Sequence, residues 1–230
     1  MHLAHHVYPL HHHRRLFTTI TVALTLALAA PTVFAQCVTT SSCWMPPGVT
    51  CAYPAPGIVF YPGVPGVGVR NSVMSDPNVC VPLPPPAGPA INSFFDVFYE
   101  IEFTFDGGQT WPPASTTAPC QVQIQPPIPA GPGLQFNTEM LQLDLLGGSL
   151  QPGVRLRESP SRPSLGGTIR QPLGGGLYQI DSFFDIFTEL SVDGGQTWHE
   201  ASQPLHFTTI DRTPLPTRVS TWGTVKIRYR

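Results

Sequence analysis

Apolar and polar residues alternate along two stretches of the chain, Ile91–Trp111 and Ile180–Trp198. A two-residue period is typical of a β-strand, in which successive side chains point to opposite faces. The face expected in the core holds Phe95, Val97, Tyr99, Ile101, Phe103 and Phe105 in the first stretch, and Phe184, Ile186, Thr188, Leu190 and Val192 in the second. The opposite face mixes phenylalanines with carboxylates. The pattern therefore predicts two long strands, each of which enters a hairpin turn.

The two stretches belong to one longer repeat. PGVGVRNS at 65–72 matches PGVRLRES at 152–159 with an offset of 87, the SFFD segments match with an offset of 89, and the DGGQTW turns match with an offset of 87. The first copy thus carries two extra residues within its strand. A two-residue insertion leaves each side chain on its own face, whereas a single insertion would invert the strand. This spacing favours strands over helices.

Shorter runs predict further strands: LQFNTEMLQLDLL at 134–146, a hairpin of Thr168–Pro172 and Gly176–Gln179, Phe207–Ile210 and Thr221–Tyr229. Many short strands separated by Gly and Pro indicate an all-β, antiparallel, sandwich-like fold. The fold has two related repeat units, or is one sandwich built from two halves. It is not a propeller, because propeller blades recur at roughly 40–50 residues.

The composition divides the chain into five segments. Residues 1–35 are expected to form a signal peptide, 36–64 an irregular Cys/Pro-rich arm, 65–125 the first repeat unit, 126–133 a Pro/Gly linker and 134–230 the second repeat unit. The leader has a His-rich start that ends in Arg14-Arg15, a short apolar run, and Val33-Phe34-Ala35 before the cleavage point, which together are typical of an export signal. General secretion is favoured over the twin-arginine route. The protein is therefore predicted to be exported, to the periplasm or the extracellular space.

Removal of the leader leaves 10 Lys and Arg residues against 14 Asp and Glu residues, a formal charge of −4. A weakly acidic chain lacks the basic surface that nucleic-acid binding requires. No second apolar run is long enough to cross a membrane, so no membrane span is expected after cleavage. A partner at the cell surface, either a protein or a polysaccharide, fits this composition.

All five cysteines lie in the first half of the chain that remains after removal of the leader. In an exported protein disulfides are the expected state, and an odd number leaves one cysteine without an intramolecular partner. Their spacing does not fix the pairing, and no nearby histidine favours a zinc site. The candidate disulfide residues are Cys37, Cys43, Cys51, Cys80 and Cys120.

Both hairpin turns fit the pattern S/T-x-D-x-G-x-T-W. The aspartate can accept hydrogen bonds from its own turn, the glycine permits a positive φ, and the tryptophan can pack beneath the hairpin. The pattern resembles the Asp-box (BNR-type) hairpin motif of sialidase-type propellers and other extracellular β proteins, in which the box is usually structural. The matching residues are Asp106, Gly108, Trp111, Asp193, Gly195 and Trp198.

A second resemblance covers approximately residues 136–229. The segments FNTEMLQLDLLGGS, GVRLRESP, SFFDIFTELSVDGGQTW and STWGTVKIRYR occur in this order. They resemble a family of exported bacterial proteins of unknown function. The resemblance implies a β-rich fold and export, and it implies no activity. The first half of the chain departs from this pattern through its Cys-rich arm.

Carboxylates recur on the mixed face of both strands. Asp185 and Glu189 are four residues apart, about 13 Å along a strand, whereas glycosidase carboxylates are roughly 5–9.5 Å apart. Because no nucleophile–base constellation is recognisable, no catalytic residue is predicted. The two residues are instead weak calcium candidates. No cofactor is expected.

Phenylalanines share the mixed face with these carboxylates. They could form a second apolar layer, which is the favoured interpretation, or an aromatic platform for a sugar or a partner. The residues of this candidate ligand face are Phe94, Phe98, Phe183 and Phe187. The sequence thus predicts an exported, non-catalytic structural or interaction protein, with a carbohydrate-binding module as the alternative and a hydrolase as a weaker one.

Overall fold

The computed structural model describes residues 37–40, 43–44, 51–75 and 81–211 of the 230-residue chain. These residues form antiparallel strands and turns, which confirms the predicted all-β, antiparallel class. The early strands are β1 (Cys37–Thr39), β2 (Cys51–Ala55), β3 (Val59–Phe60), β4 (Gly68–Ser75), β5 (Ile91–Thr104), β6 (Pro113–Ile124) and β7 (Ile128–Ala130). The later strands are β8 (Gly133–Leu145), β9 (Arg155–Glu158), β10 (Ser164–Gly174), β11 (Leu177–Ile186), β12 (Thr188–Ser191), β13 (His199–Glu200), β14 (Leu205–Thr208) and β15 (Ile210–Asp211).

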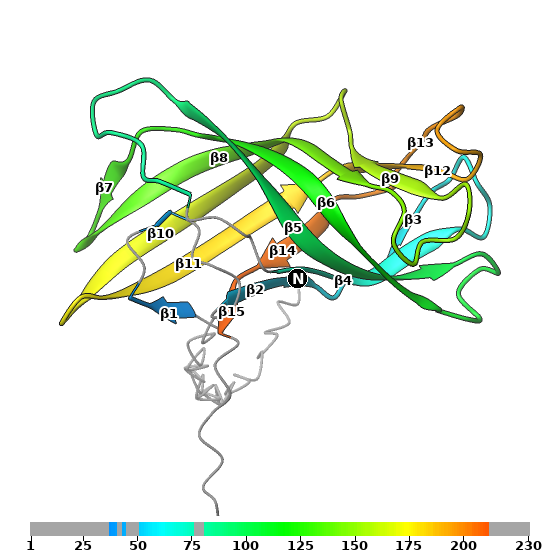
Figure 1. Ribbon diagram of the computed structural model, residues 1–230, viewed down its shortest axis with the longest axis horizontal. Coiled ribbons are helices and arrows are strands. Elements are labelled where there is room, and N and C mark those ends of the chain that lie inside the picture. The colour runs from blue at the N-terminus through cyan, green and yellow to red at the C-terminus, as the bar shows by residue number, and fades with distance from the viewer. Residues whose placement is uncertain (1–36, 41–42, 45–50, 76–80, 212–230) are drawn as a thin grey trace, which may run out of the picture. The chain divides into compact units, whose positions relative to one another are not determined.

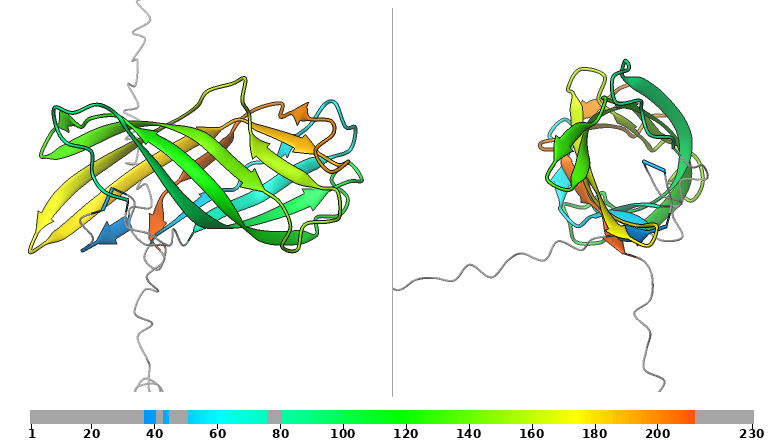
Figure 2. Two further views of the ribbon diagram at one scale, coloured as in Figure 1. Left: turned by 45° about the horizontal axis from the view of Figure 1, so that its top comes forward. Right: turned by 90° about the vertical axis from the view of Figure 1, so that its left-hand side faces the viewer.

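These strands lie in one continuous sheet that curls into a nearly closed, barrel-like arrangement (Figures 1 and 2). The order across the sheet is β11-β10-β8-β6-β5-β4-β2-β15. The sheet returns to its start because β14, which is continuous in the chain with β15, pairs with β11. The two repeat copies therefore contribute neighbouring parts of a single sheet, whereas the sequence analysis expects sandwich-like units.

A second set of strands closes one end of the barrel-like sheet. Strand β8 pairs with β10 over its first part and with β9 over its last residues, and β9 pairs with β12, which pairs with β13. The Ser202 amide, just after β13, donates to the Phe60 carbonyl of β3, which itself pairs with β4. Both hairpin turns of the repeat lie at this end, on the right in Figure 1.

One face of the sheet forms the hydrophobic core, as the alternation predicts. On β5 the side chains of Phe95, Val97, Tyr99, Ile101 and Phe103 are buried, while Phe105 in the turn is exposed. In the second copy Phe184, Ile186, Thr188 and Leu190 are buried, and Val192 in the turn is exposed. Aromatic side chains fill much of this core, among them Trp44, Tyr53, Tyr61, Phe136 and Phe207. Burial of such residues is the main source of stability in a sheet of this kind.

The second copy differs from the first where its strand is interrupted. Strand β5 is continuous for 14 residues, whereas the corresponding stretch changes partners at Phe187, between β11 and β12. The Phe187 amide donates to Ser164 Oγ at 3.1 Å, and its carbonyl accepts from the Ser159 amide at 2.8 Å. Both backbone groups stay satisfied at the break, because a side chain and a loop replace the missing ladder bonds.

Several predicted segments also take part in the sheet. Strands β1, β2 and β3 come from the Cys/Pro-rich segment 36–64, and the Pro/Gly segment 126–133 contains β7 and the turn into β8. The hairpin predicted around Gly174-Gly175 is the β10–β11 hairpin, and Phe207–Ile210 corresponds to β14 and the start of β15. The leader, Cys80 and the strand predicted at Thr221–Tyr229 lie outside the described residues. Within the described ranges, no helix is present that could cross a membrane.

Candidate functional site

The turns at Asp106 and Asp193 have the same hydrogen bonds. Asp106 Oδ1 accepts from the Gln109 and Thr110 amides at 2.9 and 3.0 Å, and its Oδ2 accepts from the Thr110 hydroxyl at 2.6 Å. Asp193 accepts from the corresponding groups of Gln196 and Thr197 at 2.9, 3.0 and 2.6 Å. These donors lower the pKa of both carboxyl groups well below the ordinary value of 3.8, because they favour the charged form.

The glycines and tryptophans of these turns also have structural roles. Gly108 and Gly195 have φ values of 94° and 93°, a conformation that favours glycine. The indole N–H of Trp111 donates to the Gly108 carbonyl at 3.0 Å, and that of Trp198 donates to the Gly195 carbonyl at 3.1 Å. The six residues of the turn pattern therefore stabilise their own hairpins, and both oxygens of each carboxylate accept hydrogen bonds from local donors.

An arginine–glutamate–tryptophan cluster lies beside each turn. Arg70 donates to Glu102 at 2.6 Å and its guanidinium lies 4.4 Å from the Trp111 ring centre. Arg157 donates to Glu189 at 2.7 Å and lies 3.9 Å from the Trp198 ring centre. All three positions differ by 87 between the copies, so the same contacts recur at the repeat spacing. The two ion pairs differ in burial, because the Glu189 side chain is 8% exposed and that of Glu102 is 28% exposed.

The weak calcium candidates, Asp185 and Glu189, each have another partner. Glu189 binds Arg157 and accepts from the Ser159 hydroxyl at 3.2 Å. Asp185 contacts His206 Nδ1 at 2.6 Å on the surface of the sheet. Among the described residues, no group of three His, Cys, Asp or Glu side chains is arranged to hold a metal ion. The structure therefore gives these two residues roles in side-chain pairing.

A polar cleft that the sequence reasoning missed lies next to Glu189. It has a volume of about 460 Å³ and is lined by Glu139, Glu158, Ser159, Ser161 and Arg162, among others. Glu158 is 9% exposed and accepts a hydrogen bond from the Ser164 hydroxyl at 3.0 Å. Burial, and to a smaller extent the nearby carboxylates, raise the pKa of Glu158 to about 7. The only sequence signal was the difference between RES here and RNS in the first copy.

The four phenylalanines of the predicted ligand face do not form one platform. Phe187 is covered by the Arg162 guanidinium, 3.6 Å from its ring centre, and Arg162 also donates to the Ala201 carbonyl. Phe94 and Phe98 lie on the outer face of β5, 68% and 36% exposed, whereas Phe183 lies on β11. The face therefore divides into two separate surfaces, one on β5 and one around Phe183.

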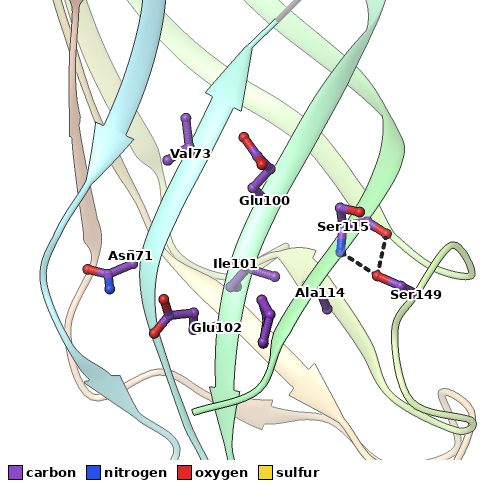
Figure 3. Close-up of a pocket in the computed structure, with 9 residues that line it drawn as sticks. Asn71, Val73, Glu100, Ile101, Glu102, Ala114, Ser115 and Ser149 are labelled. Atoms are coloured by element: carbon purple, nitrogen blue, oxygen red, sulfur yellow. Dashed lines mark hydrogen bonds between the residues drawn. The ribbon is translucent and has the colours of Figure 1, made fainter.

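The β5 surface alternates aromatic and acidic side chains. Asp96 and Glu100 occupy the outer positions between and after Phe94 and Phe98. A groove of about 380 Å³ continues this surface, and Figure 3 shows Glu100 and Glu102 on its floor. Its far wall is held by Ser149, whose hydroxyl accepts from the Ser115 amide at 2.7 Å. The result is an open, acidic surface with exposed aromatic rings.

The surface around Phe183 is smaller and includes a hollow. Phe183 is 43% exposed, and its ring stacks on His206 with 6.1 Å between ring centres. A hollow of about 100 Å³ lies beside the ring, with Gly167, Ile169, Gln135 and Asp181 among its lining residues. The absence of a side chain at Gly167 leaves this space open, because a Cβ there would lie 3.0 Å from the Phe183 ring.

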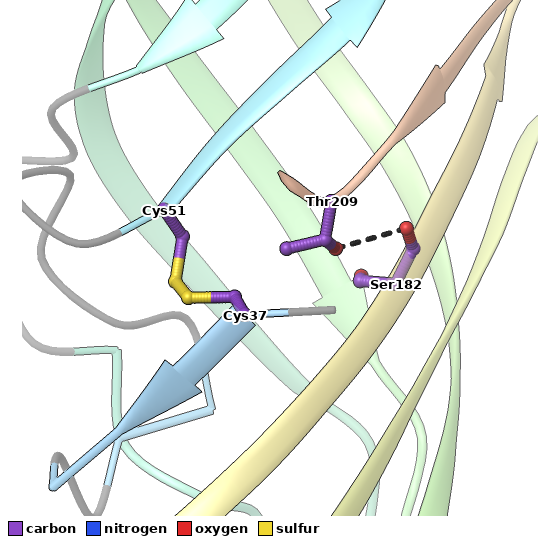
Figure 4. The surroundings of a disulfide bond; sticks show 4 residues. All are labelled: Cys37, Cys51, Ser182 and Thr209. Atoms are coloured by element: carbon purple, nitrogen blue, oxygen red, sulfur yellow. Dashed lines mark hydrogen bonds between the residues drawn. A yellow bond between two sulfur atoms is a disulfide. The ribbon is translucent and has the colours of Figure 1, made fainter. Parts of the chain in front are cut away.

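The cysteines that the structure describes are either disulfide-bonded or buried. Cys37 and Cys51 form a disulfide that links β1 to β2 (Figure 4), and Cys43 is also disulfide-bonded. Cys120 is a free, buried thiol on β6, and burial raises its pKa above the ordinary range. The expectation that an odd cysteine stays unpaired is confirmed at Cys120, whose buried thiol is a poor nucleophile.

Comparison of the chain with protein-family models, with curated proteins and with solved structures finds no match. The resemblances to the Asp-box and to a family of exported proteins therefore stay predictions.

Proposed function

We propose that the protein is an exported, non-catalytic interaction protein that binds ligands or partners through the outer surface of its sheet. The observation that carries this proposal is the state of the carboxylates. Asp106 and Asp193 accept hydrogen bonds from their own turns, Glu189 binds Arg157, and Asp185 binds His206. Such contacts orient and stabilise the fold but do not prepare a carboxylate pair for acid–base chemistry.

Export is supported by the Cys37–Cys51 disulfide, because disulfides persist in oxidising compartments. The predicted leader at 1–35 agrees with this location. A direct check is the N-terminal sequence of the protein recovered from the periplasm and the culture medium. A start at Gln36 supports the proposal, while an intact leader on protein that stays in the cytoplasm contradicts it.

The proposed absence of catalysis can be tested at Glu158, the carboxyl group whose surroundings are most like those of a general acid. A carboxyl group with a pKa of about 7 in a polar cleft is a common feature of general acids. We expect no turnover of aryl glycosides or aryl esters by the purified protein above the buffer rate between pH 5 and 8. Turnover that Glu158→Gln abolishes would replace this proposal with a hydrolase.

A second candidate function, carbohydrate binding, is favoured by the hollow beside Phe183. Sugar rings pack against aromatic faces while their hydroxyls bond to amide and carboxylate groups, and this hollow offers Phe183 with Gln135 and Asp181. Its volume of about 100 Å³ suits part of one sugar ring at the end or side of a polymer.

The test for carbohydrate binding is retention of the protein on a panel of immobilised polysaccharides. Retention should fall at least tenfold in Phe183→Ala and in Gly167→Ala, since the second change keeps the aromatic side chain but places a Cβ in the hollow, 3.0 Å from the ring. Phe94→Ala is the matched control, because it removes an exposed phenylalanine from the other surface. Equal loss in the control, or no retention of the wild type, would contradict a sugar site at Phe183.

A further inference from the structure

The charges of the chain after its leader are divided unequally along the sequence. Residues 212–230 contain five cationic side chains and no carboxylate side chain: Arg212, Arg218, Lys226, Arg228 and Arg230. Residues 36–211 contain five arginines and all 14 acidic residues. The described sheet and the C-terminal segment therefore have opposite net charges, and opposite charges attract over roughly 8–10 Å at ordinary ionic strength.

The C-terminal segment also has a two-residue period. Trp222, Thr224, Lys226 and Arg228 alternate with Gly223, Val225, Ile227 and Tyr229. In an extended conformation the first set would share one face, which combines an aromatic ring with two cations. A surface complementary to this face would be acidic and would also expose aromatic rings.

The outer face of β5 is acidic and exposes aromatic rings, and its side chains follow the same two-residue period. Its outward-facing positions alternate between aromatic and acidic side chains: Phe94, Asp96, Phe98 and Glu100. Phe94 is 68% exposed. The groove in Figure 3 continues this surface past Glu100 to Glu102, whose carboxylate is paired with Arg70. The exposed rings of Phe94 and Phe98 offer apolar area that a partner segment can cover. Charge, aromatic content and spacing on β5 are thus complementary to those of the segment.

The segment can reach this surface within its own chain. The described part ends at Asp211, which pairs with Cys51 on β2, and β2 is followed across the sheet by β4 and then β5. Neighbouring strands are about 4.8 Å apart, so three intervals from β15 to β5 amount to about 14 Å. The ten residues 212–221 can span up to about 33 Å. Chain length therefore permits an intramolecular contact.

We propose that the C-terminal segment 221–230 docks on the outer face of β5 of the same chain, with Lys226 and Arg228 against Asp96 and Glu100 and with Trp222 against the exposed phenylalanines. The segment covers the aromatic residues of β5 and leaves the Phe183 surface open. This inference is independent of any sugar bound at Phe183.

Lys226 makes the contact testable, because it is the single lysine of the chain. A zero-length carbodiimide joins an amine to a carboxylate only when the two are in contact. Treatment of the purified protein, followed by peptide mass spectrometry, should give an isopeptide bond between Lys226 and Asp96 or Glu100. In a mixture of ¹⁴N- and ¹⁵N-labelled protein, the linked peptides should come from one chain and should not be mixed.

Two variants control this experiment. Asp96→Asn with Glu100→Gln should remove the Lys226 linkages to β5, while Asp181→Asn, on the β11 surface, should leave them unchanged. Both should keep the far-ultraviolet circular dichroism of the wild type, because these side chains are on the surface. Linkage of Lys226 to other carboxylates, mixed-isotope linkages, or no linkage in folded protein would overturn the proposal.

Discussion

Burial raises the pKa of Glu158 to about 7, from an ordinary value of 4.5. A raised carboxyl pKa means that the folded state retains a proton that the unfolded state loses between pH 4.5 and 7. The associated stability is present below pH 4.5 and is lost as the pH rises through 7. The groups around Glu158 are Ser164 and the carboxylates of Glu139, Glu189 and Asp144.

We therefore expect Glu158→Gln to stabilise the protein at alkaline pH. The free energy of unfolding should match that of the wild type near pH 4.5 and exceed it by about 3 kcal/mol at pH 8, because the glutamine needs no proton to remain neutral. Urea denaturation at both pH values measures this difference. A Gln variant that loses stability equally at both pH values would show that folding does not raise the pKa of this carboxyl group.

At Asp193 the pH dependence has the opposite sign. Hydrogen bonds from Thr197, Ser191 and Gln196 lower the pKa of this carboxyl, so its contribution is present above pH 3.8 and is lost as the pH falls below that value. Asp193→Asn should lower the melting temperature at pH 7, because an amide nitrogen cannot accept from the Thr197 hydroxyl and amide. The difference from the wild type should shrink toward pH 2. Asp106→Asn, in the equivalent turn, should behave in the same way.

At the scale of elements, two strand pairs carry equivalent ion pairs with different burial. Arg157 on β9 faces Glu189 on β12, and Arg70 on β4 faces Glu102 on β5. Removal of Arg157 leaves a nearly buried carboxylate without its cation, a change that typically costs about 3 kcal/mol or more. Removal of Arg70 leaves a partly exposed carboxylate, which typically costs about 1 kcal/mol or less.

We expect Arg157→Met to destabilise the protein by about 3 kcal/mol and Arg70→Met by at most about 1 kcal/mol in urea denaturation. Methionine retains an apolar stem that can cover Trp198 or Trp111, so the comparison isolates the charge. Addition of Glu189→Gln to Arg157→Met should recover part of the loss. Equal losses at the two arginines would mean that burial does not distinguish the pairs.

The sequence predicted these elements where the signal is local. Alternation identified the buried face of β5 from Phe95 to Phe103, and glycine pairs identified the hairpin turn at Gly174-Gly175. The break at Phe187 was not predictable, because it depends on Ser159 and Ser164 from other segments. For the same reason the sequence reasoning considered Glu189 as a ligand, although its partner Arg157 lies 32 residues away. Contacts across the sheet carry no periodic signal along the chain.

At the scale of the whole sheet, closure depends on a short seam. Strand β14 pairs with β11 and strand β15 pairs with β2, so the chain changes partners at Thr209. Thr209 donates to the Ser182 carbonyl through both its amide and its hydroxyl. The Cys37–Cys51 disulfide lies at this seam, because β1 pairs with β11 while β2 pairs with β15 (Figure 4). A covalent link thus joins the two edges that the short strands bring together.

Loss of this disulfide should open the seam before the rest of the sheet. The bond closes a loop with a sequence separation of 14, for which restriction of the unfolded chain contributes about 3 kcal/mol. The variant with Cys37→Ala and Cys51→Ala should lose about this amount, and its amide hydrogen exchange should accelerate most in β1, β14 and β15. Exchange in β5 and β6, which lie on the other side of the sheet order, should change only as far as global stability falls. Cys120→Ala is the control for loss of a buried cysteine away from the seam, and acceleration that is uniform in the double variant would contradict a local role of the disulfide in closure.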